Sequence, residues 1–211
     1  MITKKIAVTA SVFLGLLVGG NAYAEKTNFS HSTLSAGLGV LSYTTPICLG
    51  VSCLSSVGTA SLAGTFQFAE DLLVVGLSAT GLSGSKPTWT VSGGSSALSI
   101  AVVKAIGDKI DVQAGIASLS SSVDVCSGGF CLTQTDTGAA IGGGLDIWLD
   151  DAKKLAAQIS FTSSKYSTAL SRNNTIGLGL GYYVNSQNEI YGSYRSNSLA
   201  SSVSAGYAHH F

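Results

Sequence analysis

The chain has 211 residues with 11 acidic and 11 basic side chains, and charged residues make up only 10% of it. A soluble domain takes about 25% of its residues from Asp, Glu, Lys and Arg, so these charges are too few to cover a water-facing surface. The balanced charge also gives no reason to expect a nucleic-acid partner. The length fits a single domain.

The first 24 residues have the pattern of a secretory signal peptide. Lys4 and Lys5 form a basic start, an apolar run follows over 6–18, and a small-Tyr-small motif ends at Ala24. The run is too short to cross a bilayer, and no later segment approaches the ~20 apolar residues that a membrane helix needs. We predict cleavage after Ala24 and export of one mature domain, 25–211.

Alternation of apolar with small or polar residues predicts ten β-strands in the mature domain. A clear example places Ile176, Leu178 and Leu180 on one face, with Gly177 and Gly179 on the other. The apolar face should meet lipid and the small residues should face a lumen. If the short hairpin 189–211 lay outside the wall, the barrel would have eight strands. The predicted strands are 34–43, 58–69, 72–83, 96–106, 109–119, 137–149, 154–166, 174–184, 189–196 and 202–211.

The predicted connections alternate between tight and long. Outer-membrane barrels have short periplasmic turns and longer outward loops, so this alternation favours that class. A secreted β-sandwich is the alternative, but it would carry charges on its outward face. Tight turns are expected near 69–71, 107–108, 150–153 and 185–188, and outward loops over 44–57, 84–95, 120–136, 167–173 and 197–201.

The last strand alternates to an aromatic terminus, through Val203, Ala205, Tyr207 and His209 to Phe211. A secreted chain with such an ending resembles bacterial outer-membrane β-barrel proteins. The resemblance implies an all-β, transmembrane, antiparallel up-and-down barrel in the outer membrane, in contact with lipopolysaccharide. It also implies that the barrel assembly machinery reads Tyr207 and Phe211 as an assembly signal, although His209 stands where the family usually has an apolar residue.

Four cysteines form two equally spaced pairs within predicted outward loops. Cys48 and Cys53 make one pair, and Cys126 and Cys131 make the other. Four cysteines permit three pairings, and four thiolates could also bind zinc. The oxidising periplasm favours disulfides, and local pairing needs only a tight loop. We therefore expect two local disulfides that pin the outward loops.

The same alternation predicts where several charged residues lie in the barrel. Asp111, Asp146, Glu189 and Arg195 should face the lumen, where a buried charge needs a partner. An Asp146–Arg195 or a Glu189–Arg195 pair is one way to meet that need. A second set falls near the predicted outer edge, where lipopolysaccharide carries phosphates: Lys86, Lys165 and Arg172.

The histidines give no indication of an active site. His31 precedes the first strand, and His209 and His210 lie at the periplasmic end of the last, whereas an enzyme of this class needs its base near the outer rim. We expect no enzyme activity and no cofactor or metal. The expected role is structural or surface-interacting, with a host or environmental ligand at the loops; the alternative is a narrow porin-like channel for small solutes.

Overall fold

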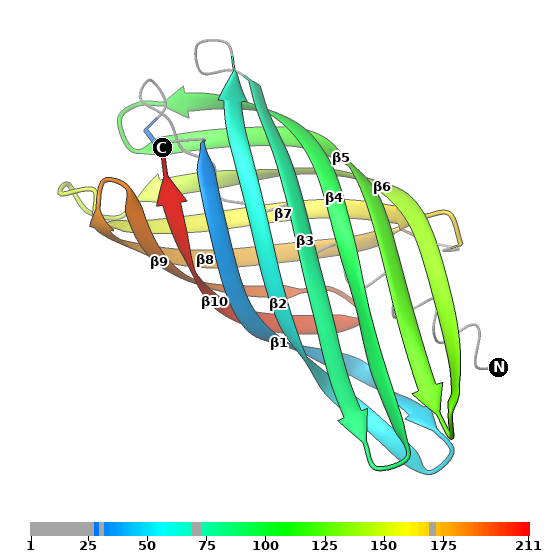
Figure 1. The fold of residues 1–211 in the computed structure, drawn as a ribbon. Coiled ribbons are helices and arrows are strands. Elements are labelled where there is room, and N and C mark those ends of the chain that lie inside the picture. Colours follow the sequence, from blue (N-terminus) through cyan, green and yellow to red (C-terminus); the bar gives the residue numbers. More distant parts are fainter. Residues whose placement is uncertain (1–27, 30–31, 69–72, 169–171) are drawn as a thin grey trace.

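The computed structural model is a closed barrel of ten antiparallel strands, each hydrogen-bonded to its neighbours in chain order (Figure 1). It describes residues 28–29, 32–68, 73–168 and 172–211, so the predicted leader lies outside the described residues. Ten strands are confirmed, and none of the described residues forms a helix that could cross a membrane. The strands are β1 (Thr33–Leu49), β2 (Ser52–Phe68), β3 (Leu73–Lys86), β4 (Trp89–Ile106), β5 (Ile110–Ser127), β6 (Phe130–Trp148), β7 (Leu155–Tyr166), β8 (Asn173–Asn185), β9 (Asn188–Ser196) and β10 (Ala200–His210).

The first and last strands close the barrel. They pair in unbroken register from Thr33 opposite His210 to Tyr43 opposite Ala200. Beyond the last strand, the amide of Phe211 donates to the carbonyl of Ser32 at 2.9 Å. Closure leaves no open sheet edge in this part of the wall, which is what a barrel in lipid requires. We call this end of the barrel the terminal end, and the end that carries both cysteine pairs the disulfide end.

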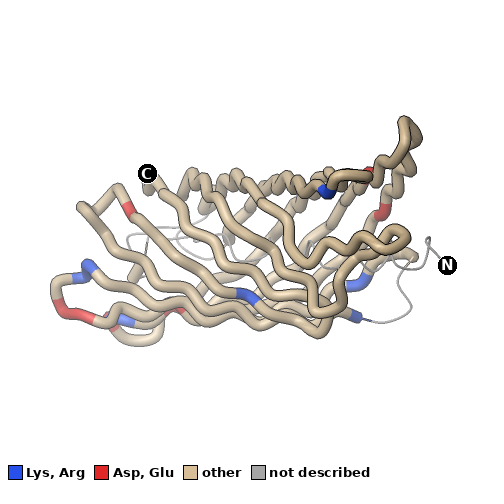
Figure 2. The backbone as a smooth tube through the Cα atoms, turned by 90° about the horizontal axis from the view of Figure 1, so that it is seen from below, with Lys and Arg blue, Asp and Glu red and all other residues tan. Residues whose placement is uncertain are grey.

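An outward belt of apolar side chains surrounds the half of the barrel nearer the terminal end. Leu38 and Leu77 are 72% and 63% exposed, and on β8 the outward stripe runs from Ile176 to Val184. That run is close to the 9–11 residues of a tilted membrane-crossing strand. Figure 2 shows that charged positions gather toward the two ends of the barrel and that long stretches of wall carry none.

The polarity of the wall reverses toward the disulfide end. On β5, the outward positions change from apolar Ile116 to Ser118 and Ser120, both exposed, while the inward positions become apolar at Leu119 and Val123, each 2% exposed. Outside the belt, the wall is therefore built like a sheet in water, with a polar outer face and an apolar inner face.

The predicted long loops at 44–57, 84–95 and 120–136 are wrong, because strands continue through these segments. Each is the end of two long strands joined by a two-residue turn, at 50–51, 87–88 and 128–129. The turns at 50 and 128–129 are formed by glycines with positive φ, a conformation that glycine adopts without strain. Alternation continues through 84–95 and 120–136, but with the apolar face inward, opposite to the outward apolar stripes of the belt. In 44–57 a register shift between Ser42 and Ile47 interrupts it.

The β1–β2 hairpin bends over the mouth of the barrel at the disulfide end. Its register shifts between Ser42 and Ile47, a β-bulge that includes Pro46, and bulges bend the strand that carries them. The arm beyond the bulge packs on the β3–β4 wall, since a Cβ on Gly84 would come within 2.7 Å of Val57 and 3.0 Å of Leu54. In Figure 1, the three long hairpins β1–β2, β3–β4 and β5–β6 project together beyond the shorter β7–β10 side.

Candidate functional site

The lumen near the terminal end contains a layer of buried carboxylates. Asp111, Asp146 and Glu189 all face inward and are at most 1% exposed. Asp146 lies opposite Asp111 in the β5–β6 register. It accepts hydrogen bonds from the side-chain amides of Gln158 at 2.9 Å and Gln113 at 3.2 Å.

Asp111 holds the segment that precedes the first strand. Its carboxylate accepts hydrogen bonds from the backbone N–H of Asn28 at 3.0 Å, from the Asn28 side chain at 3.1 Å and from the N–H of Phe29 at 3.2 Å. β5 lies across the barrel from β1, where the chain enters the wall. Residues 28–29 therefore lie across the mouth of the barrel from the start of β1.

Aromatic side chains fill the rest of the mouth at the terminal end. Phe29 stacks on Trp148 at 4.4 Å between ring centroids, and Trp148 meets the edge of Tyr183 at 4.8 Å. Tyr183 contacts His210, whose Nε2 lies 3.1 Å from a Glu189 oxygen. Sequence reasoning placed His210 at the rim, but its contact with Glu189 depends on the pairing of β9 with β10.

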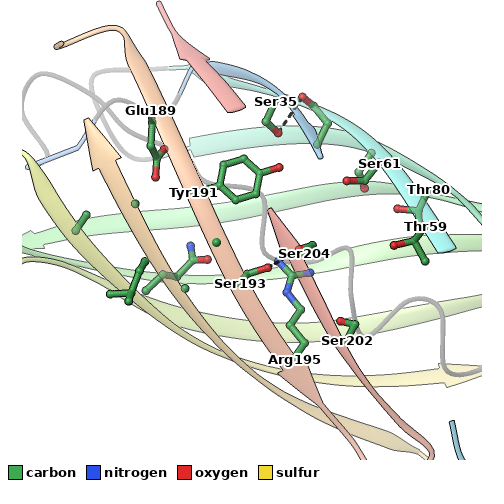
Figure 3. Close-up of a pocket in the computed structure, with 18 of the residues that line it drawn as sticks. Ser35, Thr59, Ser61, Thr80, Glu189, Tyr191, Ser193, Arg195, Ser202 and Ser204 are labelled. Carbon is green, nitrogen blue, oxygen red and sulfur yellow. Dashed lines mark hydrogen bonds between the residues drawn. The ribbon is translucent and has the colours of Figure 1, made fainter. Parts of the chain in front are cut away.

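A cavity of about 100 Å³ lies in the middle of the lumen. Figure 3 shows Glu189, Tyr191, Ser193 and Arg195 along one strand, with hydroxyl groups from β1–β3 and β10 around them. The Ser193 and Ser204 hydroxyls are 2.7 Å apart, and the Tyr191 hydroxyl donates to a β1 carbonyl at 3.3 Å. The two carboxylates suggested as partners for Arg195 have other partners, Glu189 with His210 and Asp146 with two glutamines.

Toward the disulfide end, an apolar cluster fills the lumen. Inward side chains from eight of the ten strands form it, and each is at most 9% exposed. Trp89 and Val91 come from β4, Val123 and Val125 from β5, and Tyr166 from β7. Sequence reasoning missed this cluster because it read 84–95 and 120–136 as loops. The sequence does indicate strands in these two segments, because polar residues alternate there with apolar ones, as in Trp89, Thr90 and Val91.

The four cysteines form the two local disulfides that the spacing favoured. Cys48 pairs with Cys53 and Cys126 with Cys131, each across a hairpin with 4.0 Å between Cα atoms. Both pairs lie in register positions of their hairpins, next to the turns. They therefore fasten strand ends rather than loops. In the part of the chain that the structure describes, no group of three or more His, Cys, Asp or Glu residues could hold a metal ion.

The three cations expected near the outer edge all lie exposed toward the disulfide end. Lys86 ends β3, beside the β3–β4 turn. Lys165 and Arg172 lie next to each other, each one position beyond the paired residues Ser164 and Asn173 of β7 and β8.

The turns at the terminal end carry a separate, exposed ion pair. Lys109 donates a hydrogen bond to Asp151 across two neighbouring turns. This bond holds the pKa of Asp151 below its usual value and raises the pKa of Lys109. Both groups are in water, so the pair adds little to stability.

The two residues expected to carry an assembly signal both lie on the outer surface at the terminal end. Tyr207 and Phe211 are 48% and 68% exposed. The hydroxyl of Tyr207 donates to Asn188, and the His209 ring meets the edge of Phe211 at 4.8 Å. His31, the remaining histidine, lies outside the described residues.

Comparison with solved structures identifies the architecture. The translocator domain of the autotransporter NalP from Neisseria meningitidis matches with a TM-score of 0.50 and 12% identity, over 99% of this chain and 95% of that domain. The NanC porin also matches at 0.50, with 9% identity, over 84% of this chain and all of the porin. The chain has the fold of outer-membrane β-barrel proteins. No family model and no curated protein matches the sequence.

Proposed function

We propose that this protein is an integral outer-membrane barrel that does not conduct solutes and acts through the structure it presents at the disulfide end. The apolar belt supports insertion in lipid, because side chains such as Leu38 and Leu77 would be exposed to water in a soluble protein. The closed β1–β10 seam supports it too, since lipid cannot satisfy an open strand edge.

The apolar cluster is the observation that carries the closed-lumen proposal. Apolar side chains that pack together and exclude water block a solute path, and Trp89, Val91 and Leu119 are at most 3% exposed in the part of the lumen toward the disulfide end. The arm of β1–β2 covers the cluster, with Ile47 and Leu49 packed against it. At the other mouth, Phe29 and Trp148 close the barrel.

Two features support an orientation with the disulfide end outside the cell. The polar outer face of β4–β6 beyond the belt suits water. Lys165 and Arg172 lie just beyond the apolar stripes of β7 and β8, at the height of lipid headgroups, where they bind lipopolysaccharide phosphates. In this orientation, Tyr207 and Phe211 lie on the periplasmic side, from which the barrel assembly machinery binds them.

The role that follows is structural or surface-interacting. The β3–β4 and β5–β6 hairpins extend the wall away from the membrane, and the β1–β2 arm packs against it. Disulfides fasten the β1–β2 and β5–β6 hairpins. A rigid element presents side chains and backbone groups to a partner with little loss of entropy on binding. Residues 84–95 and 120–136 therefore belong to the presented surface as strands, with their polar face outward.

Conductance in planar lipid bilayers tests the closed lumen. The purified protein should produce no discrete channel steps at either polarity. The double variant Trp89→Ser with Leu119→Ser removes apolar bulk from the cluster, and Thr90→Ser with Ser120→Thr changes only the outward face of the same strands. If the unmodified protein conducts in steps, the narrow-channel alternative replaces our proposal; steps only in the first variant support the cluster as the barrier.

A further inference from the structure

The pair Asn28-Phe29 lies in the mouth at the terminal end as a peptide lies in a receptor, and we call this pair the latch. The Asp111 carboxylate accepts two backbone N–H groups and one side-chain N–H group of the latch at 3.0–3.2 Å. The Asn28 carbonyl accepts a hydrogen bond from the indole N–H of Trp148 at 2.8 Å, and the Phe29 ring stacks on that indole. The latch is therefore held through its backbone, its amide and its ring by side chains of β5 and β6.

The pocket around the Asn28 side chain fits only a hydrogen-bond donor. Its Nδ2 lies 3.2 Å from the carbonyl of Gly107, 3.0 Å from the carbonyl of Ile110 and 3.1 Å from an Asp111 oxygen. All three partners are acceptors, and an amide supplies two N–H donors. An aspartate at position 28 would place a carboxylate against three oxygens, so the pocket discriminates asparagine from an acid of the same shape.

The latch closes one end of the central cavity. Phe29 is 2% exposed and packs in a buried cluster with Trp148, Tyr183 and Ala156. Ala156 also lines the cavity, so the cluster and the cavity adjoin. The cavity holds about 100 Å³, roughly the volume of three water molecules, and its lining of hydroxyl groups with Arg195 supplies hydrogen-bond donors (Figure 3).

We infer that this mouth is a recognition site for an asparagine–aromatic peptide segment, occupied here by the latch, and that the latch controls the access of small polar molecules to the central cavity. The inference rests on the proposed function, because the apolar cluster has to close the other end of the lumen. Asn28 and Phe29 belong to no strand, so their release leaves the strand pairing of the wall unchanged.

Alkylation of an added cysteine by iodoacetamide, followed by mass spectrometry, tests the inference on the refolded protein in detergent micelles. Ser193→Cys places a thiol in the cavity, and Val123→Cys places one in the apolar cluster toward the disulfide end. The four native cysteines are all paired, so each added thiol is the only free one. With the latch intact, both thiols should react slowly.

Asn28→Asp should release the latch. It should speed the alkylation of Ser193→Cys at least tenfold and leave that of Val123→Cys within threefold. Asn174→Asp makes the same change at an exposed position of β8 and should leave both rates within threefold. Equal rates for Ser193→Cys with and without Asn28→Asp would overturn the latch. Equal acceleration of Val123→Cys would overturn it too, because it would mean that the whole barrel had loosened.

The double variant Asn28→Gly with Phe29→Gly removes the recognised side chains and tests recognition in trans. N-acetyl-Asn-Phe-amide at millimolar concentration should restore slow alkylation of Ser193→Cys, whereas N-acetyl-Asp-Phe-amide should not. No protection by the first peptide, or equal protection by both, would overturn recognition of the amide. Neither latch variant should give channel steps in planar bilayers, because the apolar cluster remains. Channel steps would refute the closed lumen and not the latch, so the two failures are distinguishable.

Discussion

Replacing Trp89 tests whether residues 84–95 form a packed strand. Trp89 is 3% exposed and belongs to the apolar cluster that closes the lumen. Truncating a buried tryptophan removes its transfer free energy and leaves a cavity, so Trp89→Ala should lower the free energy of unfolding by about 3–5 kcal/mol. The neighbouring Thr90→Ala changes an exposed outward side chain and should stay within about 0.5 kcal/mol.

Urea unfolding of the protein refolded into phospholipid vesicles measures both values. The chain has two tryptophans, so a Trp148→Phe background leaves Trp89 as the reporter for the unmodified site. The fluorescence emission of Trp89 should be blue-shifted in the folded state. Unfolding of the Trp89→Ala variant, which keeps Trp148, can be measured by the fluorescence of Trp148. A cost below about 1 kcal/mol for Trp89→Ala, or red-shifted emission from Trp89, would mean that this segment is a solvated loop and that the lumen is not closed by it.

Three further predictions concern the membrane belt and export. Leu178→Arg introduces a charge in the outward belt and should cost about 2–4 kcal/mol in the same assay, whereas Gly179→Ser faces the lumen and should cost much less; equal costs would contradict the lipid-facing assignment. Deleting residues 207–211 removes four of the eleven β10 positions that pair with β1, together with the terminal aromatic, so the chain should be degraded in the periplasm; a soluble, folded product would favour a β-sandwich. N-terminal sequencing of the membrane-extracted protein should begin at Glu25, and a mature form that keeps Lys4 would refute the leader.

Alternation predicted the ten strands because a barrel in lipid has a simple two-face pattern. Leu178 and Gly179 fall on their expected faces, and the expected luminal positions Asp146 and Glu189 face the lumen. The predicted strand ends were wrong beyond the apolar belt, where the outer face of the wall is polar. Beyond the belt, the apolar face of the wall points inward. A prediction based on outward apolar stripes therefore ends a strand too early, as it did at Leu119 of β5, which continues to Ser127.

The contacts inside the lumen could not be predicted from one sequence. Asn28 and Phe29 reach Asp111 and Trp148 only because the barrel brings β5 and β6 across from the start of β1. The fold of the β1–β2 arm depends on space above Gly84, which is a property of the assembled wall. Local disulfides were predictable, since a four-residue spacing fits a tight hairpin.

Labelling of native lysines in intact cells tests the central claim most directly. Lys86 and Lys165 lie toward the disulfide end, and Lys109, Lys153 and Lys154 lie in the turns of the terminal end. An amine-reactive ester on a polymer too large to cross porins should modify Lys86 and Lys165 in intact cells, and all five lysines after the outer membrane is permeabilised. Modification of Lys109 or Lys153 in intact cells, with Lys86 protected, would reverse the orientation. Recovery of the protein in the medium with all five modified would contradict an outer-membrane barrel.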